Sequence, residues 1–156
     1  MRKIADLIIE RILILLLALM LLQVLWQVFS RYMLRVPSSF TDELSRFLLI
    51  WIGLLGASYA TGKKMHLTID LLPNYVTGRK KKMLDLLIHI LVILFALLVM
   101  VIGGSRLVYI TLTLGQTSSA LEIPLGYIYL IIPFSGIMII FYSVLNLLED
   151  PVKTAP

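Results

Sequence analysis

The stretch SSFTDELSRF, residues 38–47, places two carboxylates and a guanidinium directly before a long uncharged segment. Adjacent carboxylates can work as a catalytic dyad, pair with a cation, or meet another protein. At a helix start, Asp42 and Glu43 are stabilised by the helix dipole, and Asp42 with Arg46 forms an i,i+4 pair in the favourable order. Arg46 lies one turn into the apolar run, where an unpaired cation is costly. The stretch therefore predicts an internal staple or a docking surface for another subunit, and not a catalytic dyad.

A polar stripe precedes this stretch at helical spacing, and its members are Gln23, Gln27, Ser30 and Arg31, with Trp26 among them. Polar side chains that face lipid are costly, so the stripe should point at another helix. Bonding within the chain is the expectation for Gln23, which lies deepest. Gln27 and Arg31 are expected to share a network with the acids and the arginine of residues 38–47.

The two histidines, His66 and His89, are the only imidazoles, and the chain has no cysteine. Two histidines on different helices can ligate a membrane haem. His66 lies among lysines at a span end, however, and His89 only about two turns into a span, so neither is near the midplane. Solvated or interfacial histidines are the favoured interpretation, and the absence of cysteine excludes disulfides and thiolate chemistry.

A stripe of small residues follows in the next span, at Gly53, Gly56, Ala57 and Ala60. Small residues at this spacing let helix backbones approach closely in a membrane. The stripe predicts a helix–helix contact and no chemistry of its own. Gly136, Ser143 and Asn146 repeat the pattern more weakly near the end of the chain.

The elements that carry these residues are membrane spans. Of 156 residues, 60% are hydrophobic and 15% charged, and the mean hydropathy is +0.97. A hydrocarbon core needs roughly 20 helical residues per crossing, and the apolar runs predict a single domain, residues 1–156, with spans at about 12–32, 41–62, 83–112 and 124–148. The predicted fold class is thus an all-α membrane protein of four transmembrane helices. The net charge of +5 lies mainly between spans, where it sets orientation rather than indicating nucleic acid.

The connection between the second and third spans carries six of the 14 Lys and Arg residues and is compatible with a short interfacial helix in its first half. The residues expected at lipid headgroups are Lys63, Lys64, Arg79, Lys80, Lys81 and Lys82. Counting the basic residues of every loop puts more of them on the side of the two termini. By the positive-inside rule both termini are therefore expected in the cytoplasm, and residues 38–47 on the opposite side.

Four stretches in this order resemble the small membrane subunit of tripartite ATP-independent periplasmic (TRAP) transporters. They are FSRYML, FTDELSRFLLIWIGLLGAS, KKMHLTIDLL and GQTSSALEIPLGYIYLIIP. The likeness covers nearly the whole chain in length and span order. One departure is that members of the family often carry tryptophan after the IP pair, where this chain has Leu125, Gly126 and Tyr127.

The resemblance implies a sodium-coupled, binding-protein-dependent system of a bacterial inner membrane that takes up organic acids such as dicarboxylates, keto acids or sialic acid. It implies a heterodimer with a large multi-span subunit that holds the substrate and sodium sites, a transient periplasmic binding protein, and a scaffolding role for this chain without cofactor, metal or catalysis. The residues expected at the partner interface are Gln27, Arg31, Asp42, Glu43, Arg46, Trp26 and Trp51.

Two other functions are compatible with four apolar helices. One is a membrane anchor of a redox enzyme that binds quinone or haem, for which a Soret band would be the sign. The other is a small stand-alone exporter that works as a dimer. All nine acids lie near span ends, so no acid is available at mid-membrane as a proton relay, which disfavours the exporter.

Overall fold

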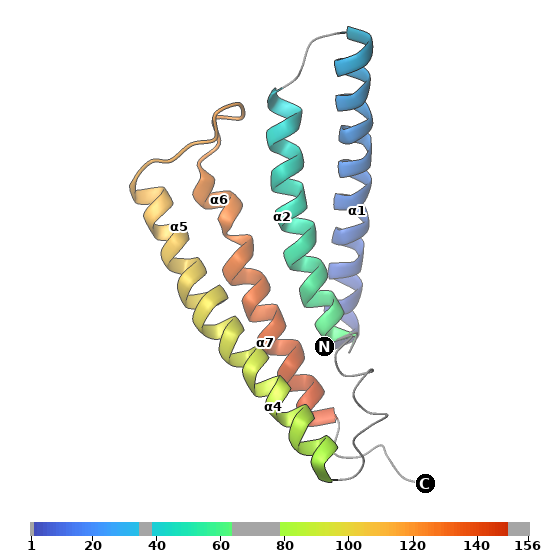
Figure 1. Cartoon of the computed structure of the whole chain (residues 1–156), viewed down its shortest axis with the longest axis vertical. Helices are drawn as coiled ribbons and strands as arrows, with labels where there is room; N and C mark the ends of the chain where they lie inside the picture. The colour runs from blue at the N-terminus through green and yellow to red at the C-terminus, as the bar shows by residue number, and fades with distance from the viewer. Residues whose placement is uncertain (1, 35–38, 64–78, 150–156) are drawn as a thin grey trace.

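The computed structural model describes residues 2–34, 39–63 and 79–149, and all regular elements in these ranges are helices (Figure 1). The chain order is α1 (Arg2–Phe29), a π-helical turn η1 (Ser30–Leu34), α2 (Ser39–Gly62), α4 (Arg79–Phe95), a π-helical segment η2 (Ala96–Gly103), α5 (Gly104–Thr113), α6 (Leu125–Tyr129) and α7 (Ile131–Glu149). Four segments are long and apolar enough to cross a membrane, at Ala5–Met33, Ser39–Gly62, Leu86–Thr113 and Leu125–Leu148. The predicted all-α membrane fold is confirmed. The proposed interfacial helix would fall within residues 64–78, outside the described ranges.

The four spans lie side by side as a layer in the order α1, α2, α6–α7 and α4–α5 (Figure 1). Packing follows this order, because α1 packs on α2, α2 on α7, and α7 on η2 and α4. The start of α1 and the end of α7 lie at the same end of the layer. We refer to the opposite end, where η1, the start of α2 and residues 114–124 lie, as the loop end.

The last span is interrupted between α6 and α7 at Leu130, three residues before Pro133. Proline has no N–H to donate to the carbonyl four residues earlier, which is that of Tyr129. The helix nevertheless continues, because the Phe134 N–H donates to the Leu130 carbonyl at 3.3 Å. The interruption at Leu130 therefore does not end the fourth span.

The close helix contacts occur at other glycines than the stripe on α2. A Cβ added to Gly136 would meet the Met100 Cβ at 2.7 Å, and one added to Gly104 would meet Ile132 at 2.8 Å, so α7 and the third span touch backbone to backbone. At Gly53 and Gly56 nothing lies within 4 Å of such an atom. The predicted helix–helix contact of the small-residue stripe is therefore not made within the described part of the chain.

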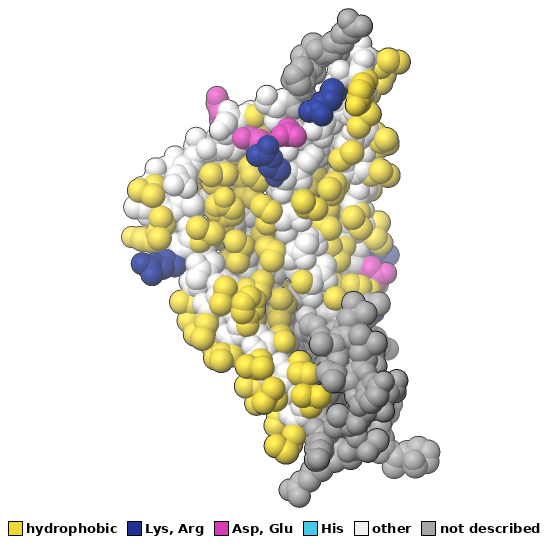
Figure 2. Space-filling model, viewed as in Figure 1, with side chains coloured by type: hydrophobic (Ala, Val, Ile, Leu, Met, Phe, Trp, Pro, Cys, Tyr) yellow, Lys and Arg dark blue, Asp and Glu magenta, His cyan; other side chains and the backbone are white. Residues whose placement is uncertain are grey.

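The outer surface of the layer is apolar, and little of the chain is enclosed. Figure 2 shows hydrophobic side chains over most of the visible face and charged side chains in only a few small groups. The buried hydrophobic residues are few: Ile9, Leu16, Leu55, Ala96, Met100, Val108, Ile128, Ile131, Ile139 and Tyr142. A surface of this kind is stable only against lipid or another apolar protein surface.

Candidate functional site

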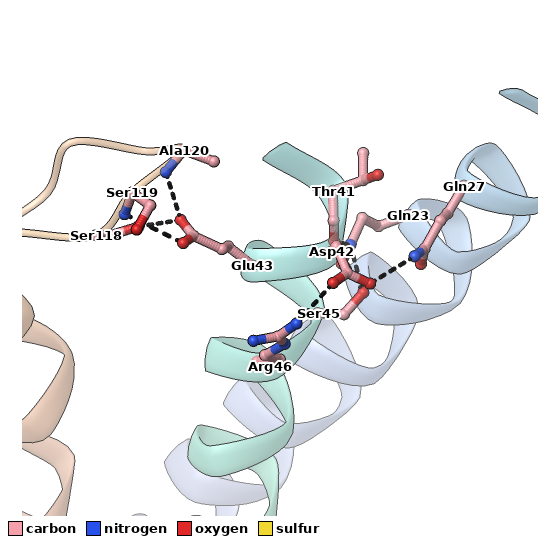
Figure 3. A network of polar contacts seen from close by, with 10 residues as sticks. All are labelled: Gln23, Gln27, Thr41, Asp42, Glu43, Ser45, Arg46, Ser118, Ser119 and Ala120. Atoms are coloured by element: carbon pink, nitrogen blue, oxygen red, sulfur yellow. Dashed lines mark hydrogen bonds and ion pairs between the residues drawn. The ribbon is translucent and has the colours of Figure 1, made fainter. Parts of the chain in front are cut away.

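Ten residues at the loop end form three neighbouring groups of hydrogen bonds, which together we call the polar cluster (Figure 3). Its members are Gln23, Gln27, Thr41, Asp42, Glu43, Ser45, Arg46, Ser118, Ser119 and Ala120. They come from three places in the chain: α1, the first two turns of α2, and the loop between α5 and α6. The polar cluster thus joins segments that are far apart in sequence.

Asp42 connects α1 to α2. Its Oδ2 accepts a hydrogen bond from Arg46 Nη2 at 2.8 Å, and its Oδ1 accepts one from Gln27 Nε2 at 3.0 Å. The predicted i,i+4 pair is therefore present, and Gln27 shares its network as expected. The Arg46 side chain keeps 72% of its surface exposed, so the pair contributes little to stability by itself. Of the two bonds to Asp42, the one from Gln27 joins α1 to α2.

Gln23 forms a second link between the same helices, one turn deeper. Its Nε2 donates to the Thr41 carbonyl and, at 2.6 Å, to Ser45 Oγ. Ser45 Oγ in turn donates to the Thr41 carbonyl at 3.0 Å. Gln23 is buried, so these bonds lie away from water and replace partners that lipid could not supply.

Glu43 points away from Asp42, to the loop between α5 and α6. Its carboxylate accepts hydrogen bonds from the Ser118 hydroxyl and from the backbone N–H of Ser119 at 3.1 Å, Ala120 at 2.9 Å and Leu121 at 3.3 Å. Successive backbone N–H groups that converge in this way make a concave anion site. Here a carboxylate of the same chain fills that site.

The loop is shaped to present those N–H groups. Thr117 and Pro124 form an isolated antiparallel bridge, and the Ser118 N–H donates to the Ile123 carbonyl at 2.9 Å. The turn uses left-handed backbone at Glu122, with φ of 55°, and the helix end uses it at Gly115, with φ of 61°. The loop is thus a closed turn whose inner face receives Glu43.

The other residues predicted at a partner interface are placed differently. The Trp51 Nε1 donates to the Ile128 carbonyl at 3.1 Å, so this side chain joins α2 to α6. Trp26 is 54% exposed and contacts Phe29 with ring centroids 5.9 Å apart. Arg31 is exposed and does not enter the polar cluster. The network expected to include both Arg31 and Glu43 with Asp42 is therefore wrong in these two members, because Arg31 lies beyond α2 on η1 and Glu43 faces the loop.

The end of the layer opposite the polar cluster holds the basic residues and the buried histidine. Lys63 lies 3.8 Å from an Asp6 carboxylate oxygen and 5.3 Å from the centre of the Tyr59 ring, so it contacts α1. Residues 79–82 form the first turn of α4, whereas Lys64 and His66 lie outside the described ranges. His89 is buried among the helices, so its side chain is not solvated. Among the described residues no group of three or more His, Cys, Asp or Glu could hold a metal ion.

Chemically, the polar cluster is a set of structural links, because each carboxylate already has several donors. The sequence did not reveal that residues 118–121 would receive Glu43, although the serines of this turn and its short side chains are compatible with exposed N–H groups.

Asn146 makes another contact between distant segments that the sequence indicated only weakly. Its Nδ2 donates to the Thr61 carbonyl at 2.9 Å, which ties α7 to the end of α2 in a fully buried position.

Comparison with known proteins identifies a family and several relatives of this chain. Residues 20–151 match the family described as tripartite ATP-independent periplasmic transporters, DctQ component. The sialic acid TRAP transporter small permease protein SiaQ of Vibrio cholerae is 28% identical over 137 residues, which cover 84% of this chain and 79% of that protein. A Haemophilus influenzae protein, whose name also places it among TRAP small permeases, is 29% identical over 142 residues, 89% of this chain and 86% of its own length.

A third relative is much larger. The sialic acid TRAP transporter permease protein SiaT of Haemophilus influenzae is 32% identical over 66 residues, which are 42% of this chain and 11% of that protein. The family match covers most of the chain and identifies a transporter component rather than an enzyme, so a redox-enzyme anchor is not supported. The chain is an integral, multi-pass membrane protein and belongs to the family of small permease subunits of TRAP transporters.

Proposed function

We propose that this chain is a static scaffold that binds a large multi-span transporter subunit along one face of α2. The observation that carries the proposal is the outward face of that helix, which we call the α2 stripe. Its members are Arg46, Leu49, Gly53, Gly56, Ala57 and Ala60. Their spacing by three, four and seven residues puts them on one side of the helix.

The α2 stripe is smooth and uncovered. Leu49 is 59% exposed, and no atom of the described residues lies within 4 Å of a Cβ built on Gly53 or Gly56. Lipid chains gain little from such a surface, whereas a second helix can approach it closely and gain van der Waals contact. The stripe has the composition of a helix-packing surface while no helix of the described chain packs there.

The large relative supports the same partnership. In the Haemophilus influenzae permease protein, the segment similar to this chain is 11% of the whole length, so there it is part of a much longer permease polypeptide. We expect this chain to lie against a permease of that kind as well. The exposed candidates Arg46, Arg31 and Trp26 then become the residues available to such a partner at the loop end.

The transported compound is proposed to be an organic acid, and sialic acid is the substrate class that the names of two relatives favour. Sodium coupling and substrate binding would lie with the large subunit, since no acidic residue lies at mid-membrane in this chain. A periplasmic binding protein would approach the loop end. This requires both termini in the cytoplasm of a bacterial inner membrane, as the distribution of basic residues predicts.

The test is copurification from cells that express the tagged chain together with its neighbouring transporter genes. Gly53→Leu and Ala57→Leu, each on the α2 stripe, should lower recovery of the large subunit about tenfold, because overpacking of a helix contact costs on the order of 1–3 kcal/mol. Gly103→Leu is the matched control, because Gly103 is exposed on the third span with only the Leu98 carbonyl within 4 Å. Full recovery with both stripe variants would refute the proposed contact face.

A further inference from the structure

Arg106 on α5 is the only Asp, Glu, Lys or Arg between Leu86 and Thr113, the limits of the third span. The side chain is exposed, and within the described residues it makes no hydrogen bond or ion pair. Tyr109 lies one helical turn toward the loop end, is 70% exposed, and its hydroxyl likewise has no partner in the described ranges. The third span thus presents a cation and a phenol to its surroundings.

The depth of Arg106 follows from the length of the uncharged run before it. Residues 86–105 contain no Asp, Glu, Lys or Arg, and at the α-helical rise of 1.5 Å these 20 residues are at most about 30 Å long, because Ala96–Gly103 are π-helical. That length equals the thickness of the hydrocarbon core. If the run fills the core, Arg106 lies at the boundary between hydrocarbon and headgroups on the side of the loop end, where the phosphates of phospholipids are found.

An exposed guanidinium at this level needs an anion. A guanidinium can donate two parallel hydrogen bonds to one phosphate, and tyrosine is typical of the same layer because it is apolar except for its hydroxyl. The carboxylates of the polar cluster are not available, because Asp42 and Glu43 already accept hydrogen bonds from other groups. The neighbouring exposed side chains, Ile102 and Ile110, are suited to acyl chains.

We propose that Arg106 and Tyr109 form a binding site for the phosphate of a phospholipid in the leaflet at the loop end. The guanidinium binds two phosphate oxygens, the Tyr109 hydroxyl donates to the same group or to the glycerol backbone, and the acyl chains run along α5 and η2. A carboxylate of a partner protein would satisfy the same guanidinium, but the apolar side chains around it fit lipid better. The site does not depend on the proposed scaffold role, because it requires only a membrane.

The experiment is native mass spectrometry of the full chain in detergent, titrated with dioleoylphosphatidylglycerol. The wild-type chain should retain lipid, and Arg106→Gln should retain it about tenfold more weakly, as expected for one lost charge-assisted contact. Tyr109→Phe, which keeps the ring, should weaken retention about twofold to threefold. Arg11→Gln is the charge-matched control, because Arg11 is an exposed arginine without an aromatic residue one turn away, and it should retain lipid as the wild type does.

Two further titrations test whether the phosphate that binds belongs to a phospholipid or is free phosphate. Dioleoylglycerol, which lacks the phosphate, should not distinguish wild type from Arg106→Gln, and inorganic phosphate should not displace the phospholipid. Equal retention of the phospholipid by wild type and Arg106→Gln would overturn the proposal. So would loss of the copurified large subunit in Arg106→Gln with lipid retention unchanged, since the arginine would then pair with a protein carboxylate.

Discussion

Asp42 and Glu43 are consecutive in sequence, yet their carboxylates bind different segments on the two sides of α2. Asp42 accepts a hydrogen bond from Gln27 on α1, whereas Glu43 accepts hydrogen bonds from three backbone N–H groups in the loop between α5 and α6. Successive side chains on a helix point about 100° apart, so a pair at its first turn can reach both flanks. The start of α2 is thereby fixed to both sides of the layer.

The contact between Glu43 and the loop predicts a stability effect that depends on charge. Glu43→Gln keeps the shape but replaces one acceptor oxygen by a donor that faces N–H groups, so the unfolding free energy should fall. Thermal unfolding of the purified chain in detergent measures the change. Glu122→Gln is the control, because Glu122 lies in the same loop, its side chain is exposed, and its carboxylate accepts no hydrogen bond within the described residues. Equal midpoints for the two variants would show that Glu43 does not hold the loop.

The bond between Gln27 and Asp42 predicts coupling between α1 and α2. A double-mutant cycle with Gln27→Leu and Asp42→Ala should give an interaction energy on the order of 1 kcal/mol in unfolding free energy. The cycle subtracts the loss of the Arg46 pair, which occurs in every variant that lacks Asp42. Additive effects of the two substitutions would mean that the 3.0 Å bond contributes nothing measurable.

Substitution of two glycines by alanine should have different effects on the thermal midpoint. Gly136→Ala brings a Cβ to 2.7 Å from the Met100 Cβ and 3.3 Å from the Ala96 carbonyl oxygen, so α7 and the third span must separate, and the thermal midpoint should fall. Gly56→Ala meets nothing within 4 Å and should leave the midpoint unchanged or raise it, since alanine favours helix over glycine by up to about 1 kcal/mol. Similar losses in both variants would contradict the packing of α7 against η2.

Arg46 tests whether the polar cluster also faces a partner. Arg46→Glu reverses an exposed charge and should lower copurification of the large subunit. Asp42→Ala removes the internal partner of Arg46 but leaves the guanidinium in place, and it should preserve more of the complex. Unchanged complex yield and transport with Arg46→Glu would show that this residue is only an internal staple of α2.

The four spans and the i,i+4 pair of Asp42 with Arg46 could be predicted from the local sequence pattern. Length and apolarity determine a span, and the bond between Asp42 and Arg46 needs only four residues of helix. The partner of Glu43 could not be predicted in the same way, because it consists of backbone N–H groups 75 residues or more away that carry no sequence signature. Their position depends on a turn whose shape is set by Gly115 and Glu122.

The small-residue stripe shows a second limit. Gly53 and Gly56 have the spacing of a packing surface, and that property is the same whether the partner helix belongs to this chain or to another. Gly136 was a weaker signal, yet a Cβ added there would come within 2.7 Å of the Met100 Cβ on the third span. Composition can predict that a helix face will be packed, but only the arrangement of all the helices decides which face remains for another protein.

The partners of Asp42 and Glu43 lie at very different distances along the chain, and this difference has a consequence for biosynthesis. Gln27 and Asp42 are 15 residues apart, so the first two helices can associate as soon as both have left the ribosome and entered the membrane. The carboxylate of Glu43 must then remain hydrated at the membrane surface until residues 118–121 have been synthesised. The four-helix layer would be complete when the turn binds that carboxylate. A nascent chain that is stalled before this point would still expose the charge to water.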